Sequence, residues 1–95
     1  MYYLKSSYRF LYFEKSKRRN KKYDAVLKKV GRGNVIRIPF GDERYQQYED
    51  TTGLGEYTHL DHLDKKRRIS YMKRHSGFIQ KDFYSPGYYS MKYLW

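Results

Sequence analysis

Residue types that bind metal ions gather in one short segment of the sequence. His59, His62 and Asp64 supply two imidazoles and a carboxylate, which are ligand types that divalent cations take in proteins. Two residues separate the histidines, a spacing compatible with one helical turn. The same segment also fits the start of a helix, where Asp61 and Asp64 cap free backbone N–H groups. We favour this second interpretation, so no metal ion and no cofactor is expected.

Groups that could carry out a reaction are poorly represented. The chain has no cysteine, which excludes a disulfide scaffold, a thiolate metal site and a cysteine nucleophile. No serine lies in a Gly-x-Ser-x-Gly turn, and residues 31–34 lack the Lys-Ser/Thr pair of a phosphate-binding loop. Adjacent acids, as at Asp42 and Glu43, point apart on a strand or a helix, so a shared proton is not expected. The sequence predicts no enzymatic activity and no small-molecule substrate.

Basic residues interleaved with aromatic residues are the strongest signal in the composition. The 95 residues include 21 Lys and Arg against 10 Asp and Glu, a formal net charge of +11 that favours anionic partners. Cations neutralise nucleic-acid phosphates, and tyrosine rings stack on unpaired bases. The cations predicted to contact nucleic acid or another anion form two clusters: Lys15, Lys17, Arg18, Arg19, Lys21 and Lys22, and then Lys65, Lys66, Arg67, Arg68, Lys73 and Arg74.

An acidic segment separates the two basic clusters. Residues 42–64 hold Arg44 alone against seven acids. This segment can fold back on either basic flank, or it can simply be solvated. The sequence leaves both arrangements open.

The aromatic residues support a protein partner equally well. They make up 20% of the chain, with 13 Tyr, 5 Phe and 1 Trp, and Tyr and Arg are enriched at protein interfaces. A chain of this length has a modest core, so we expect neighbouring subunits to cover many of the rings. The residues predicted to lie at such a protein interface are Tyr2, Tyr3, Tyr8, Phe10, Tyr12, Phe13, Tyr88, Tyr89, Tyr93, Leu94 and Trp95.

The elements that would position these residues indicate a small α+β protein. Residues 1–22 form an extended aromatic and basic arm without a clear period, which packs on the body of the chain or on another subunit. A single domain follows over residues 23–95. It begins with a β-hairpin, whose strands cover residues 23–30 and 35–38 and whose turn covers residues 31–34. Pro39 marks a strand end or an edge strand, because proline cannot donate a ladder hydrogen bond.

Two helices are predicted in the second half. The first covers residues 61–75, with Asp61 as N-cap and Gly77 as the terminating residue. Its apolar side chains fall on two sides, which suits a helix between two neighbours. The second is a short aromatic helix over residues 88–95, preceded by Ser85 as cap and by Pro86 at the first helical position.

The order of motifs over about residues 23–95 resembles a family of small basic proteins of nucleocytoplasmic large DNA viruses, of the algal and giant virus type. The shared pattern is Phe40-Gly41 followed by nearby tyrosines, a basic helix ending in Tyr71-x-x-Arg74-His75, and an aromatic tail ending in Leu94-Trp95. No catalytic residue is implied.

This resemblance implies a virion structural protein, namely a minor capsid protein that cements the major capsid subunits of an icosahedral particle. Its partners would be the major capsid protein and other minor capsid proteins, with contact to the inner membrane surface. It would reside in the capsid shell, and in the host cytoplasm during assembly. The alternative is a basic nucleic-acid-binding protein associated with the viral genome.

Overall fold

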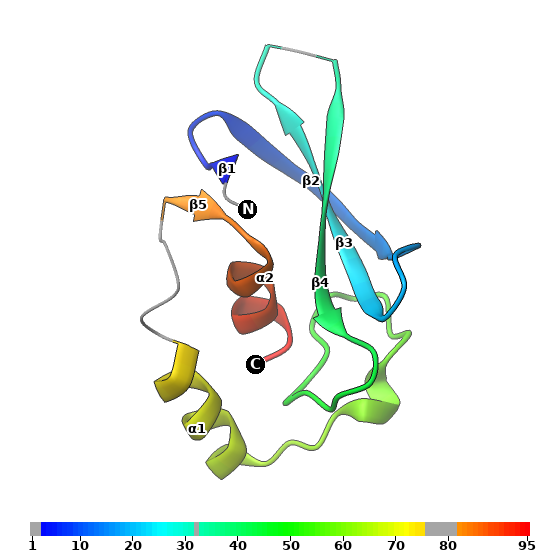
Figure 1. Ribbon diagram of the computed structural model, residues 1–95, viewed down its shortest axis with the longest axis vertical. Helices are drawn as coiled ribbons and strands as arrows, with labels where there is room; N and C mark the ends of the chain where they lie inside the picture. The colour runs from blue at the N-terminus through cyan, green and yellow to red at the C-terminus, as the bar shows by residue number, and fades with distance from the viewer. Residues whose placement is uncertain (1–2, 32, 76–81) are drawn as a thin grey trace.

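The computed structural model describes residues 3–31, 33–75 and 82–95 of the chain. The elements are β1 (Tyr3–Leu4), β2 (Tyr8–Lys15), β3 (Lys21–Lys29), β4 (Val35–Asp42), a 3-10 turn (Thr58–Leu60), α1 (Lys65–His75), β5 (Phe83–Tyr84) and α2 (Pro86–Tyr93). Strands β2, β3 and β4 form an antiparallel sheet in that order, and β1 pairs with β5. Helix α2 lies against the larger sheet, whereas α1 lies at one end of the molecule (Figure 1). The predicted α+β class is confirmed.

The predicted hairpin is confirmed as strands β3 and β4. Their register pairs Ala25 with Ile38 and Tyr23 with Phe40, so the apolar residues of both strands share one face. Pro39 lies inside β4 and opposite Asp24. The strand tolerates proline because β4 is at the edge of the sheet, as predicted.

The N-terminal segment is extended, as predicted, and packs on the body of the chain. Strand β2 pairs with β3 along most of its length, and the register shifts between Phe10 and Tyr12. This irregularity changes the alternation of side chains halfway along the strand. It explains why the sequence shows no single strand period there.

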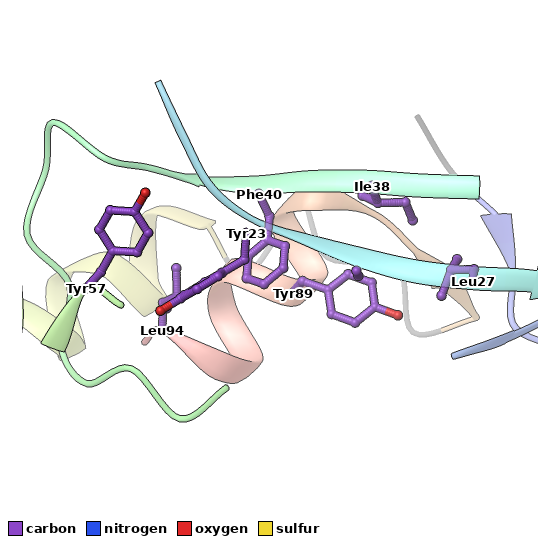
Figure 2. Close-up of a cluster of buried hydrophobic side chains, with 8 residues drawn as sticks. Tyr23, Leu27, Ile38, Phe40, Tyr57, Tyr89 and Leu94 are labelled. Atoms are coloured by element: carbon purple, nitrogen blue, oxygen red, sulfur yellow. The ribbon is translucent and has the colours of Figure 1, made fainter. Parts of the chain in front are cut away.

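Aromatic side chains build most of the core between the larger sheet and α2. Tyr23, Phe40 and Tyr89 are fully or almost fully buried, together with Leu27, Ile38 and Leu94 (Figure 2). The Phe40 ring lies 5.5 Å from that of Tyr89, and the Tyr23 ring lies 5.3 Å from that of Tyr57. The rings of this chain therefore cover one another to a large extent, contrary to the expectation that neighbouring subunits must do so.

This core corrects the predicted protein interface at two positions. Tyr89 and Leu94 are each only 1% exposed, so they cannot contact a partner. Most of the other predicted interface residues are partly buried against the core: Tyr3, Tyr8, Phe10, Phe13, Tyr88, Tyr93 and Trp95. Tyr12 is exposed, and Tyr2 lies outside the described residues.

The C-terminal helix begins as predicted. Ser85 is its N-cap, with Oγ accepting a hydrogen bond from the backbone N–H of Tyr88, and Pro86 occupies the first turn. The helix ends at Tyr93, and Leu94 is its C-cap.

Helix α1 begins three residues later than predicted, with its N-cap at Asp64 instead of Asp61. The carboxylate of Asp64 accepts hydrogen bonds from the backbone N–H groups of Lys66 and Arg67, so Asp64 rather than Asp61 caps the helix. No residue of α1 is buried, and Ile69 is exposed. The expected two-sided packing of this helix is therefore not found within the described chain, and Gly77 lies outside the described residues.

Two buried tyrosines give opposite expectations for removal of a hydroxyl. Tyr23 donates to Asp50 at 2.5 Å and accepts from the Glu56 N–H at 3.0 Å, whereas the buried Tyr89 hydroxyl has no hydrogen-bond partner in the described chain. We expect Tyr23→Phe to lower the free energy of unfolding by about 1–3 kcal/mol, because it leaves both partners unsatisfied. Tyr89→Phe should leave it unchanged or raise it by up to about 1 kcal/mol. Urea unfolding followed by circular dichroism measures both, and a larger loss for Tyr89→Phe than for Tyr23→Phe contradicts this account.

Candidate nucleic-acid interface

An open cleft of about 850 Å³ lies between α1, the segment that follows β4, and the C-terminal residue. Helix α1 contributes Lys66, Arg67, Ser70, Tyr71, Arg74 and His75, the segment after β4 contributes Arg44, Tyr45 and Gln46, and the third wall is Trp95. The cleft thus joins the second predicted basic cluster to three aromatic side chains.

Trp95 holds α1 in place through ring stacking and a hydrogen bond. The Tyr71 ring is parallel to the Trp95 indole within 3°, with centroids 4.2 Å apart. Arg68 Nε donates to the backbone oxygen of Trp95 at 2.6 Å, and the Arg68 guanidinium lies 4.8 Å from the centroid of the Tyr48 ring. Arg67 adds a hydrogen bond of 2.8 Å to the Gln46 side chain. An otherwise exposed helix is therefore fixed relative to the opposite wall of the cleft.

Trp95 is itself positioned by hydrogen bonds between the last residues of the chain and the acidic segment. The backbone oxygen of Leu94 accepts from the N–H groups of Tyr48 and Glu49, at 3.0 and 3.1 Å. Because the Leu94 side chain is buried in the core, the indole is placed at a fixed distance from the sheet.

Arg44 and Tyr45 stand on a tight turn at the end of β4. Both oxygens of Asp42 accept from the Arg44 guanidinium, at 2.9 and 2.7 Å, and Asp42 Oδ1 also accepts from the Arg44 N–H. These hydrogen bonds lower the pKa of Asp42 to about 2 and raise the pKa of Arg44. The next ring, that of Tyr45, is 65% exposed.

The charged residues that line the cleft are all cations. Its lining includes four cations, Arg44, Lys66, Arg67 and Arg74, and none of the lining residues that the structure describes is acidic. Only Arg44 among them has a carboxylate partner in the described part of the chain. Uncompensated cations beside aromatic rings suit a ligand that carries both negative charge and flat rings.

Helix α1 presents the second predicted basic cluster at the surface. Lys65, Lys66, Arg67, Arg68, Lys73 and Arg74 are all exposed, and three of them line the cleft. Arg68 is directed to Trp95, as described above.

The first predicted basic cluster is not part of this cleft. Lys17, Arg18 and Arg19 lie in the turn between β2 and β3, well separated from α1 (Figure 1). Lys15 is 4.0 Å from Glu56, and Lys21 is half-buried. A smaller cavity beside this turn is lined by Lys17, Arg18 and Arg37 together with the acids Glu14 and Asp24, so its charge is mixed.

The prediction that Lys22 contacts an anion is wrong. Its side chain is only 2% exposed, and Nζ donates to the backbone oxygen of Tyr45 at 2.9 Å and to Gln47 Oε1. Burial lowers the pKa of Lys22 to about 8, although nearby carboxylates oppose this effect. A lysine enclosed in this way cannot bind an external phosphate.

The histidine segment does not assemble as a metal site. His62 Nδ1 accepts a hydrogen bond from the Asp64 backbone N–H at 2.9 Å, and burial lowers the pKa of His62. His59 is exposed, with its ring 6.2 Å from that of Tyr57. Among the described residues, no three His, Asp or Glu side chains are grouped so that they could hold a metal ion.

Sequence reasoning missed Arg44 and Tyr45. The available signal was that Arg44 is the only cation in an otherwise acidic segment and is followed directly by a tyrosine. It also missed Tyr71 as the ring that attaches α1 to the C-terminus.

Comparisons with known proteins provide no relative for this arrangement. No family model matches the chain, and neither a curated protein nor a solved structure is significantly similar to it. In the described part of the chain, neither helix has the length and apolar character needed to cross a bilayer.

The buried lysine makes stability depend on pH in a defined direction. Since the pKa of Lys22 is about 8 in the folded protein and about 10.4 in an unfolded chain, the unfolded state binds more protons between these values. The contribution of Lys22 is constant below pH 8. From there to about pH 9, where tyrosines of ordinary pKa are still mostly protonated, we expect the free energy of unfolding to rise by about 1 kcal/mol.

Urea titrations at several pH values, compared with the variant Lys22→Met, measure this contribution. The rise should be present in the wild-type protein and absent from the variant. Equal pH profiles for the two proteins would show that Lys22 is not buried as described.

Proposed function

We propose that this chain is a nucleic-acid-binding protein and that the cleft beside α1 is its binding surface. The observation that carries the proposal is the composition of the cleft: four cations and three aromatic side chains, without an acid among its described lining residues. Cations supply sequence-independent attraction to phosphates, and aromatic rings supply contact area for bases.

The arrangement of cations on α1 favours a polymeric anion as the ligand. Lys66, Ser70 and Arg74 are spaced by four residues, so they form a row along one face of the helix. With a rise of about 1.5 Å per residue, Lys66 and Arg74 are separated by about 12 Å along the axis. Their charges are thus spread along the cleft wall, which suits a chain of phosphates better than one compact anion.

Charge neutralisation in the cleft should weaken binding in a salt-dependent way. We expect Lys66→Gln combined with Arg74→Gln to lower affinity for a single-stranded oligonucleotide, and to reduce the slope of log K against log salt by about 1.4, since each phosphate contact contributes about 0.7. Fluorescence anisotropy across a salt series measures both effects.

The matched control is Lys17→Gln combined with Arg19→Gln, which removes the same charge from the turn between β2 and β3. This control should leave the salt slope unchanged. Equal losses for the two double variants would assign binding to overall charge rather than to the cleft.

A second candidate function is that of a minor capsid protein, and the tip of the β3–β4 hairpin favours it. The end of β3 and the start of β4 extend beyond the rest of the described chain (Figure 1), and the side chains of Val30 and Val35 there are exposed. Apolar side chains on a projecting hairpin are suited to insertion between neighbouring subunits, such as major and minor capsid proteins. This role also agrees with the family that the sequence resembles, and it is compatible with contact to a membrane surface through the cations.

A charge at the hairpin tip tests the capsid role. We expect Val30→Lys to reduce incorporation of the chain into particles several-fold, because a lysine cannot be buried in an apolar pocket of a neighbour. Quantitative immunoblotting of purified particles measures this effect. The control is Leu63→Lys, since Leu63 and Val30 are similarly exposed, at 58% and 61%. Normal incorporation of Val30→Lys would argue against a structural role for the hairpin.

A further inference from the structure

We infer that the ligand of this cleft is a single strand, and that an unpaired base stacks on Tyr45. This inference rests on the proposed function and specifies which form of nucleic acid the site selects. It follows from the state of the three aromatic side chains and from the shape of the cleft.

Tyr45 has an exposed ring on a fixed backbone. Its backbone N–H donates to the backbone oxygen of Asp42 at 3.1 Å, and its own backbone oxygen accepts from the buried Lys22 Nζ. The side chain is nevertheless the most exposed of the large apolar and aromatic side chains in the described chain. Because the backbone is already ordered, a base that stacks on this ring has to order only the side chain.

The other two aromatic rings of the cleft, those of Tyr71 and Trp95, already stack on rings within the protein. Tyr71 stacks on Trp95 and also on His75, with centroids 4.2 Å apart in each pair. The indole of Trp95 additionally contacts the His62 ring at 5.1 Å. Tyr71 and Trp95 therefore form a preassembled wall, and Tyr45 faces the cleft as the ring best placed to accept a base.

Arg44 complements Tyr45 at the same edge of the cleft. Its guanidinium lies 5.7 Å from the centroid of the Tyr45 ring, and the Asp42 carboxylate holds it in one orientation. A guanidinium over one face of the ring is a cation–π contact, so a base stacks on the opposite face of Tyr45. Lys66, Arg67 and Arg74 remain to contact the phosphates.

The shape of the cleft distinguishes a single strand from a duplex. Its volume of about 850 Å³ is in the range of about 300–1,000 Å³ typical of ligand pockets. A duplex keeps its bases paired and stacked, so it can reach the cations of α1 with its phosphates but leaves the aromatic part of the cleft unfilled. A splayed base of a single strand can enter.

Binding of a 12-nucleotide oligo(dT) and of a 12-base-pair duplex, followed by fluorescence anisotropy at the same salt concentration, tests the inference. We expect the wild-type protein to prefer the single strand. Tyr45→Ala should weaken single-strand binding by roughly tenfold, the effect of losing one stacked base, and leave duplex binding unchanged. Tyr45→Phe should retain the preference, because it keeps the ring. Tyr12→Ala is the matched control, since Tyr12 is an exposed tyrosine on β2, outside the cleft.

The single tryptophan of the chain gives an independent signal from inside the cleft. Because Trp95 lines the site, oligo(dT) should change its emission at the same concentrations at which anisotropy rises. Equal affinity for both forms, or an unaltered preference in Tyr45→Ala, would overturn the inference while leaving the proposed function intact. A lack of binding to either form, or binding without salt dependence, would instead remove the proposed function.

Discussion

One buried glutamine fixes the segment from which the cleft is built. Gln47 is completely buried and uses its backbone N–H and C=O and both ends of its side-chain amide in hydrogen bonds. Its partners are Lys22, Tyr57, Leu60, Asp61 and His62. An unsatisfied amide in this position would cost about 1–3 kcal/mol, so the loss of one partner would destabilise the segment. Residues 43–64 contain one 3-10 turn and otherwise little regular structure. Gln47 connects them to Lys22 of β3, in addition to the hydrogen bonds that Tyr23 makes with Asp50 and Glu56.

The C-terminal residues extend this constraint from the sheet to α1. Leu94 is buried between the sheet and the acidic segment, and its oxygen accepts from two consecutive backbone N–H groups. Trp95 then stacks on Tyr71 of α1. Close packing leaves little room for change here: a methyl group at Gly41, whose φ is +73°, would lie 2.8 Å from Leu94 Cδ1. The geometry of the cleft therefore depends on the packing of the core as well as on its own lining residues.

Local sequence signals predicted the elements that depend on neighbouring residues. The hairpin and the Ser85-Pro86 helix start are of this kind, because turn chemistry and capping act over a few residues.

Long-range partners account for what the sequence could not predict. Asp61 resembles a helix cap, but its carboxylate accepts from Gln47 and from the Asp50 N–H, so the helix begins after Asp64. Lys22 resembles its basic neighbours, yet it is buried because Gln47, 25 residues away, provides an acceptor. Among the cleft residues, the cations of α1 were predicted and Tyr45 was not, since its role depends on which other rings are already stacked.

The distribution of charge follows from these internal bonds. The acidic segment does fold back on the chain, but several of its carboxylates bind structural groups: Asp50 binds the Tyr23 hydroxyl, Asp61 binds Gln47, and Asp64 caps α1. Within the described residues, the ion pairs involve Lys15, Arg37 and Arg44, and none includes a cation of α1. Acids that hold the fold together thus do not neutralise the basic helix beside them. Of the four cations that line the cleft, only Arg44 has a carboxylate partner, so within the described residues no ion pair reduces the positive charge of Lys66, Arg67 and Arg74.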